Sequence, residues 1–467
     1  MRTSSASAVR LTIPLLLLVV VSACTTAVAG EPVGTGAVVT NPDPGTGGVD
    51  PSFIKNSDGG EIDQLAAAVL TDVRGYWTET FPATFDGRDW EELSGGYFSV
   101  DTASADAPAP PCVDKAADVE GNAFYCPSED VIAWDRAALL PVLRERFGEA
   151  AVMLVLAHEM GHAVQRRAGI SVEEQRTDPE RYPTILVEAQ ADCYAGSFVR
   201  WVAEGNAEHL SIAEDRLDSA LESLITFRDP IGTEQTDAGA HGDAFDRVSA
   251  FQDGYDSGAG LCADISVDNR RFTQRGFRQA ADAERGGNLR FDDLVQNMTD
   301  DLGEYFDTVV TDAGATWTAP SLAPVENDPE CDRDQGPIAF CPDDDEIEIS
   351  TEGELPQLHQ QVGDYATGII LAGRYGMAAL DALDKPLEGE QTQRQLLCLS
   401  GSYTGMLLDR TNGFTLSPGD LDEAIQVLLR YDYPGRDGAG GAIDTGYERV
   451  SVFRAGTLEG VTACELS

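Results

Sequence analysis

The strongest constraint on the fold of this chain is an internal repeat. Residues 245–251 read FDRVSAF and residues 447–453 read YERVSVF, and in both places two glycines and a cysteine follow at the same spacing. Further matches occur upstream in the same order and pair residues 123–127 with 338–342, 65–81 with 294–310, and 194–196 with 403–405. Because 467 residues suffice for two or three domains, we predict two tandem copies of one domain, at residues 61–265 (copy one) and 270–467 (copy two).

The cysteines support this division. Cys24 stands alone near the N-terminus, and the other eight form an even set of the kind that makes disulfides in an oxidising compartment. The repeat pairs them as Cys112–Cys126 and Cys193–Cys262 in copy one, and as Cys331–Cys341 and Cys398–Cys464 in copy two. In this alignment Cys398 lies a few residues out of register with Cys193, so the repeat specifies the two long pairs less directly than the short ones.

The N-terminus predicts the compartment. After two arginines, residues 11–21 form an apolar run of signal-peptide length, too short to span a bilayer comfortably. Small residues directly before Cys24 resemble the bacterial lipobox, in which the cysteine is lipidated and begins the mature chain. We therefore expect a lipoprotein signal peptide at residues 1–23 and an extracytoplasmic protein that the lipid anchors to the cell membrane of a bacterium. An ordinary secretory signal with an incidental cysteine is the alternative.

Two broader compositional features follow. Residues 24–60 are rich in Gly, Thr, Pro and Asp, which predicts a flexible tether. The whole chain has 32 Lys and Arg residues against 80 Asp and Glu residues, a formal net charge of −48. This charge repels phosphates and anionic lipid headgroups, so it argues against nucleic acid as a partner and against electrostatic docking on a membrane.

Residues with catalytic chemistry gather in copy one. Residues 147–168 predict a helix with apolar residues on one face and a glycine as a stop signal. His158 and His162 lie four residues apart and project from the same face, which is the spacing that places two imidazoles on one zinc ion. Glu159 can then take a proton from zinc-bound water. A surface helix with two solvated histidines is the alternative interpretation.

A second helix is expected to supply a third ligand. Residues 185–193 are largely apolar and hold Glu188 and Asp192 one turn apart. Glu188 would complete a His₂Glu zinc site with its fourth position open for water. Asp192 would accept a hydrogen bond from a ligand histidine and so fix its tautomer. The alternatives are the reverse assignment, with Asp192 as the ligand, and a solvated acidic face.

These motifs together resemble the bacterial putative neutral zinc metallopeptidases. The resemblance covers most of copy one and rests on HEMGHAVQ at residues 158–165, EAQADCYAG at 188–196, NAFYCP at 122–127, and His241-Gly242 ahead of Arg247. It implies an α+β, mainly helical, zincin-like fold, in which a small antiparallel sheet packs on helices and the HExxH helix lies at the floor of the cleft. It also implies a zinc cofactor (Zn²⁺) and peptidase activity on a peptide or protein substrate.

The remaining histidines differ in context. His241 lies in the family-like stretch that ends at Arg247, and a histidine in the cleft could hydrogen-bond the oxyanion of a tetrahedral intermediate. A structural cap or a surface residue is the alternative. Copy two keeps the arginine as Arg449 without a matching histidine, which suggests that both arginines are structural. His209 and His359 have no supporting context, and we expect them at the surface.

Copy two is predicted to be catalytically degenerate. In register, His158 becomes Gly373, Glu159 becomes Arg374 and His162 becomes Met377, while the alignment places Leu397 opposite Glu188 and Gly401 opposite Asp192. Because neither glycine nor arginine holds zinc, copy two should be a metal-free relative of copy one. Packing on copy one as a pseudo-dimer, shaping the cleft and binding a partner are its alternative roles.

The leading hypothesis is therefore a membrane-anchored zinc metalloendopeptidase, in which His158, His162 and Glu188 hold the metal and Glu159 is the base. The rival hypothesis is a non-catalytic envelope binding lipoprotein with a structural or vestigial zinc site. Copy two favours the rival because its scaffold persists without ligands, but a structural zinc site has no use for Glu159. A third hypothesis makes copy two a lid that blocks activity.

Overall fold

The structure is a computed structural model that describes residues 49–466, except 214–215, 238 and 332–333. The predicted signal peptide, Cys24 and most of the predicted tether lie outside the described residues. Among the described residues, no helix combines the length and the apolar character needed to cross a membrane.

The first half contains a four-stranded sheet in the order β1-β2-β4-β3. Its strands are β1 (Ile54–Lys55), β2 (Gly96–Val100), β3 (Ala123–Cys126) and β4 (Val131–Asp135). β1 pairs with β2 and β2 pairs with β4 in parallel, while β3 pairs with β4 in antiparallel fashion. The expected antiparallel sheet is therefore wrong. A long helix separates β1 from β2 in the chain, and such a crossover allows the two strands to run in the same direction.

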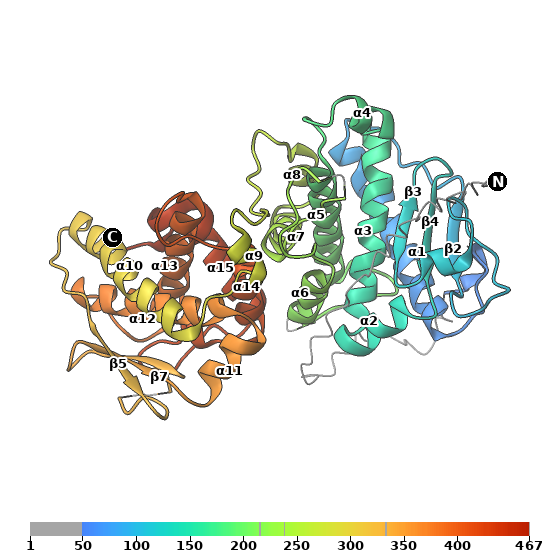
Figure 1. Ribbon diagram of the computed structural model, residues 1–467. Coiled ribbons are helices and arrows are strands. Elements are labelled where there is room, and N and C mark those ends of the chain that lie inside the picture. Colours follow the sequence, from blue (N-terminus) through green and yellow to red (C-terminus); the bar gives the residue numbers. More distant parts are fainter. Residues whose placement is uncertain (1–48, 214–215, 238, 332–333, 467) are drawn as a thin grey trace, which may run out of the picture. The chain divides into compact units, whose positions relative to one another are not determined.

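The sheet lies at one end of the first half, and the helices build most of the core (Figure 1). They are η1 (Pro51–Phe53), α1 (Glu61–Thr84), η2 (Ala116–Val119), α2 (Leu139–Phe147), α3 (Glu149–Ala168), α4 (Val172–Thr177), α5 (Thr184–Ala203), α6 (Leu217–Thr226), α7 (Ala244–Ser257) and α8 (Ala259–Asp264). α3 packs against α1, α5 and β3, and α5 packs against α7 (Figure 1). α3 begins after Gly148 and ends before Gly169, whose positive φ angles of 80° and 112° suit glycine.

Among the described residues, the second half has a similar order of elements, without counterparts of β1 and α4. It comprises α9 (Ala280–Glu284), α10 (Phe291–Asp312), β5 (Ser321–Val325), β6 (Ile338–Cys341), β7 (Glu346–Ser350), α11 (Glu354–Gln361), α12 (Asp364–Ala382), α13 (Glu390–Asp409), α14 (Asp420–Arg430), η4 (Tyr433–Gly435), α15 (Gly446–Glu459) and η5 (Gly460–Cys464). Its sheet has the order β5-β7-β6, with one parallel and one antiparallel pairing, as in β2-β4-β3. The mainly helical α+β fold is thus as expected, while the duplication of one domain stays a prediction.

All four predicted disulfides are present. Cys112 pairs with Cys126 and Cys331 with Cys341, and both bonds fix a short loop next to a strand. Cys193 pairs with Cys262 and Cys398 with Cys464, so α5 is tied to α8 and α13 to η5. The eight cysteines of copy one and copy two therefore pair as the repeat predicts.

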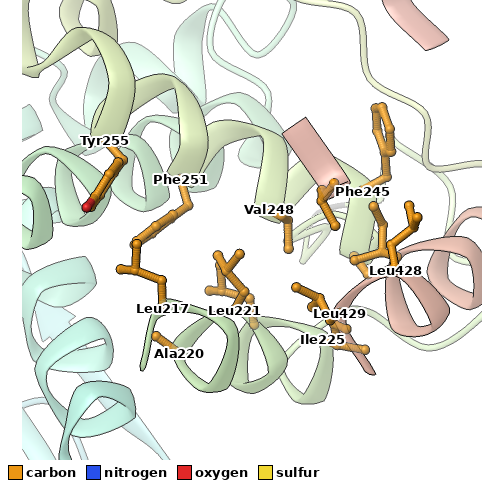
Figure 2. Packing of buried hydrophobic residues seen from close by; sticks show 14 of the residues in the cluster. Leu217, Ala220, Leu221, Ile225, Phe245, Val248, Phe251, Tyr255, Leu428 and Leu429 are labelled. Atoms are coloured by element: carbon orange, nitrogen blue, oxygen red, sulfur yellow. The ribbon is translucent and has the colours of Figure 1, made fainter. Parts of the chain in front are cut away.

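Apolar contacts join the two halves. Figure 2 shows Leu221 and Ile225 of α6 and Phe245 of α7 beside Leu428 and Leu429 of α14. All five side chains are buried and belong to a single hydrophobic cluster with members from both halves. Removing such leucine side chains from water is worth roughly 1.5–3 kcal/mol each, so this contact contributes to the stability of both halves.

The end of the predicted tether is ordered. Residues 51–55 form η1 and β1, and Ile54 is 3% exposed and pairs with Tyr97 of β2. The predicted boundary at residue 60 stays a prediction, although residues 51–55 already belong to ordered elements. Their composition resembles a linker, but the side chain of Ile54, the edge pairing with β2 and the contact of the Phe53 ring with Tyr97 hold the segment on the sheet.

Candidate metal centre

The candidate metal centre lies where α3 and α5 cross. The two helices approach closely because Gly161 has no side chain, and a Cβ atom there would lie 2.9 Å from the Cα atom of Ala191. This crossing brings His158 and His162 of α3 next to Glu188 of α5, with potential ligand atoms within 4.8 Å of one another. The three side chains are 10%, 18% and 11% exposed, so the centre is shielded but still reachable from solvent.

The spacing of these atoms fits zinc. His158 Nε2 lies 3.2 Å from Glu188 Oε2, and His162 Nε2 lies 3.6 Å from the same oxygen. Two ligand atoms that each lie about 2.1 Å from an ion at a tetrahedral angle are about 3.4 Å apart. The donor set therefore suits tetrahedral zinc with one position left open, although ligation of zinc itself stays a prediction.

Asp192 lies on the opposite side of the His158 ring from Glu188. Its Oδ1 atom is 2.7 Å from His158 Nδ1, and Arg247 donates to both of its oxygens at 2.9 Å. Asp192 is fully buried; burial alone would raise its pKa, but the charges of Arg247 and His158 hold that pKa at about 2. The ionised carboxylate accepts the Nδ1 hydrogen and leaves Nε2 for a metal, which favours Glu188 over Asp192 as the ligand.

Gln165 fixes the tautomer of His162, as Asp192 fixes that of His158. Its Oε1 atom lies 3.0 Å from His162 Nδ1, while its amide nitrogen donates to the backbone oxygen of Val187 at 2.5 Å and to Gln190 Oε1 at 3.1 Å. An amide oxygen only accepts, so this contact places the hydrogen on Nδ1 and frees His162 Nε2. Our sequence interpretation assigned no role to Gln165, although the residue ends the motif that carries the family resemblance.

The electrostatics of the centre favour a cation. Burial would lower the pKa of His158, but Asp192 and then Glu188 raise it to about 10. Burial would raise the pKa of Glu188, but the charges of His162 and His158 hold it well below its ordinary value. Two buried carboxylates thus face two imidazoles, and a metal ion would take the place of the protons that the imidazoles otherwise hold.

The two remaining predicted residues, Glu159 and His241, differ in their element and in their exposure to solvent. Glu159 follows His158 on α3 and is 7% exposed. His241 precedes α7; its ring is 50% exposed and its Nδ1 atom lies 3.2 Å from Asp229 Oδ1. The hydrogen bond to Asp229 raises the pKa of His241, and the charge of Glu188 raises it further. His241 is therefore within the electrostatic field of the centre, and Asp229 is a second residue to which our sequence interpretation gave no role.

The structure gives the contacts of the other residues that the sequence singled out. Arg247 pairs with Asp192, whereas Arg449 donates to backbone oxygens of residues 428 and 443, so each arginine has structural contacts of its own. His209 was expected at the surface; its ring is 23% exposed and lies 2.7 Å from a carboxylate of α1. His359 is half-buried and lies 3.0 Å from the backbone oxygen of Leu289.

Comparison with known proteins agrees with this centre. Residues 10–265 match the family described as "Putative neutral zinc metallopeptidase", which is more than half of the chain. The chain belongs to this family. The match to the metallopeptidase family spans all residues of the candidate centre, including His241 and Arg247.

The curated relatives are similar over a shorter region. The chain is 27% identical over 155 residues to "Uncharacterized protein YpfJ" of Escherichia coli strain K12, which covers 29% of this chain and 50% of that protein. The same figures hold for the protein of that name in Escherichia coli O6:H1. The chain thus spans about half the length of the curated relatives it matches, and no solved structure matches it.

In the second half, the corresponding crossing of α12 and α13 is filled by protein atoms. Arg374 occupies the position of Glu159, and its guanidinium donates to the backbone oxygens of Tyr433 and Arg436, the latter at 2.6 Å. Arg374 is fully buried. An arginine does not ligate zinc, so the loss of the zinc site in the second half stays a prediction.

The structure corrects the alignment of α13. Gly401 meets the backbone oxygen of Phe453, as Gly196 meets that of Phe251, so Gly401 corresponds to Gly196 and not to Asp192. The disulfides place Cys398 with Cys193 in the same register. The residues opposite Glu188 and Asp192 are therefore Gln393 and Leu397, four residues earlier than the sequence alignment placed them. The matching tyrosines at 194 and 403 had shifted that alignment by one helical turn.

Proposed function

We propose that the chain is a zinc-dependent endopeptidase whose active site is the crossing of α3 and α5. The observation that carries the proposal is the convergence of His158 Nε2 and His162 Nε2 on one oxygen of Glu188, next to Glu159. Membership of the metallopeptidase family supports the same class of reaction. A purely structural zinc site needs no glutamate beside its first histidine.

Each residue of the site has its own role in the proposed reaction. Zinc, when bound by His158, His162 and Glu188, supplies a Lewis acid that polarises the scissile carbonyl and activates a water molecule. Glu159 accepts the proton of that water and later delivers it to the leaving amine. The Asp192 carboxylate and the Gln165 amide hold the two ligand rings in place during this cycle.

His241 is proposed to stabilise the tetrahedral intermediate. Asp229 accepts the Nδ1 hydrogen of His241, so the Nε2 atom is a donor only when the imidazole is protonated. The raised pKa of His241 favours that protonated form. A half-exposed imidazolium beside the centre can reach the developing oxyanion of a bound peptide.

We also propose that the enzyme acts outside the cytoplasm, on peptides or proteins, while a lipid on Cys24 holds it at the membrane of a bacterium. Four disulfides support an oxidising compartment. The non-catalytic binding lipoprotein stays the second candidate. The buried Arg374 at the crossing of α12 and α13 supports it, because that crossing has an arginine where the crossing of α3 and α5 has Glu159.

Chelation separates the two candidates. Treatment with a zinc chelator should abolish cleavage of a mixed peptide library while circular dichroism and the unfolding transition stay close to native, because four disulfides and a shared core hold the fold. Added zinc should restore cleavage. A chain that cleaves no peptide when zinc-loaded, and that unfolds on chelation, would favour the binding lipoprotein with a structural metal.

A further inference from the structure

Three buried carboxylates meet in the second half, away from the candidate peptidase site. They are Asp364 in the first turn of α12, and Asp420 and Glu423 in the first turn of α14. One oxygen of each lies within 4.8 Å of the others. The residues are 3%, 5% and 6% exposed, so water does not screen their mutual repulsion.

Each carboxylate uses one oxygen for the backbone. Asp364 Oδ2 accepts from the nitrogen of Leu289 at 2.6 Å, Asp420 Oδ2 from that of Ser417 at 2.8 Å, and Glu423 Oε2 from that of Tyr365 at 2.8 Å. The other oxygens of the two aspartates, both named Oδ1, are buried without a hydrogen-bond partner. Such atoms are costly, so the arrangement calls for a ligand that accepts electron pairs.

No protein cation in the described part of the chain fills this role. None of the ion pairs of the described residues includes Asp364, Asp420 or Glu423. The charges of Arg285 and Arg275 lower the pKa of Asp364 and Asp420, respectively, but do not offset the effect of burial. Burial and mutual repulsion raise the pKa of Asp364 to about 6 and hold those of Asp420 and Glu423 well above their ordinary values. Without a cation these carboxyls therefore hold protons more readily than ordinary ones do, and a bound cation would take the place of those protons.

The first half has an arginine beside the carboxylate that opens α3. Glu149 opens α3 as Asp364 opens α12, each directly after a glycine with positive φ. Arg144 lies 3.4 Å from Glu149 and 3.0 Å from Glu61, so its charge is shared between the two carboxylates. In the second half the residue five positions before the carboxylate is His359, and burial lowers its pKa, so it is neutral. The first half thus has a charged arginine, Arg144, at a position where the second half has the neutral His359.

We propose that Asp364, Asp420 and Glu423 bind a calcium ion. Calcium takes oxygen ligands in variable geometry, and carboxylates from two helix starts supply them without a fixed octahedral frame, which magnesium would demand. The ion would join the N-terminus of α12 to that of α14. Because α14 also packs on α6 and α7, the ion would stabilise the helix that contacts the first half.

Calcium titration of the complete mature chain, zinc-loaded and dialysed free of calcium, tests this proposal. Thermal unfolding should shift upward with calcium and saturate at roughly 10⁻⁴–10⁻³ M or below, as for extracellular sites. Glu423→Gln should lose the shift, and its calcium-free form should unfold at the same or a higher temperature than calcium-free wild type, because Gln removes a buried group that is costly to ionise next to two other carboxyls. Glu352→Gln, the same change at an exposed position, should keep the full shift.

Three outcomes would overturn the proposal. They are no calcium-dependent shift in the wild type, an equal shift with magnesium, and an unchanged shift in Glu423→Gln. If that variant does not fold, Asp364→Asn takes its place, and equilibrium dialysis with calcium should show one site fewer per chain than wild type. None of these measurements uses peptide cleavage, so the calcium site and the peptidase proposal can fail independently.

Discussion

At the scale of single residues, the hydrogen bonds of the two Nδ1 atoms determine the tautomers of His158 and His162. They leave both Nε2 atoms free to bind a metal. Gln165 accepts a hydrogen bond from His162 Nδ1, and Asp192 accepts one from His158 Nδ1. Gln165 is 2% exposed and Asp192 is 0% exposed. Replacing Gln165 by leucine keeps the bulk of the side chain but removes the acceptor for His162. Zinc affinity should fall about 10–100-fold, measured by competition with a zinc-binding dye. Gln361→Leu, at an exposed position, serves as the control, and equal affinities in the two variants would refute the role of Gln165.

The Asp229–His241 pair makes a prediction about pH. The pKa of His241 is raised in the folded enzyme, and the protonated ring is the form that donates through Nε2. Activity that depends on this donor is present below the raised pKa and lost as pH rises through it. Asp229→Asn keeps an acceptor oxygen but removes the negative charge that helps to hold the proton on His241, so the alkaline limb of the kcat/KM profile should move to lower pH. A limb that stays in place would mean that His241 does not act as the donor.

The candidate ligand residues could be selected from the sequence because their spacing is rare, whereas the residues that support them could not. HExxH and Glu-x-x-x-Asp each specify a helix face, and a chain with five histidines offers few chance matches. Gln165, Asp229 and Arg247 are ordinary polar residues whose role depends on which backbone or ring they reach. That information is tertiary: Arg247 meets Asp192 only because α7 packs on α5.

At the scale of elements, close helix packing positions Arg247. Gly254 lies where α7 crosses α5, and a Cβ atom there would fall 1.8 Å from the backbone oxygen of Cys193. Gly254→Ala should therefore push the helices apart, destabilise the protein by about 1–3 kcal/mol or more in urea unfolding, and lower zinc affinity by moving Arg247 away from Asp192. Gly75→Ala in α1, where a Cβ atom meets nothing within 4 Å, should be neutral or stabilising by about 0.5–1 kcal/mol. Equal effects of the two changes would refute the packing argument.

Helix identity was easier to predict than helix register. The buried helix around residues 147–168 and the one around 185–193 both exist, with ends set by glycines and a proline. α13 was placed one turn out of register because Tyr403 matched Tyr194, and a buried helix tolerates apolar residues on every side. The disulfide Cys398–Cys464 and the close approach of Gly401 fix the register, and neither is visible as periodicity.

At the scale of the whole molecule, the two halves share buried surface. Leu428 of α14 is fully buried against α6 and α7 of the first half (Figure 2). Leu428→Asp should cost about 3 kcal/mol or more, because it buries a charge without a partner. Leu458→Asp, at a leucine that is 41% exposed, should cost far less. If urea unfolding showed equal stabilities for the two variants, the contact between the halves would contribute nothing.

The same contact changes how the lid hypothesis can be tested. A chain that stops near residue 265 would expose the apolar faces of α6 and α7 that α14 covers, so loss of solubility on size-exclusion chromatography is expected rather than a gain in turnover. A soluble, folded and more active truncation would show instead that the second half restrains the peptidase.

The central claim is that Glu159 acts as the base of a zinc peptidase, and Glu159→Gln tests it most directly. The change removes the proton acceptor but leaves His158, His162 and Glu188 in place. Bound zinc, measured by elemental analysis, should stay at one ion per chain, while kcat/KM for a cleaved peptide should fall about 10²–10⁴-fold. Cleavage within a few-fold of wild type, with zinc still bound, would contradict the proposed function.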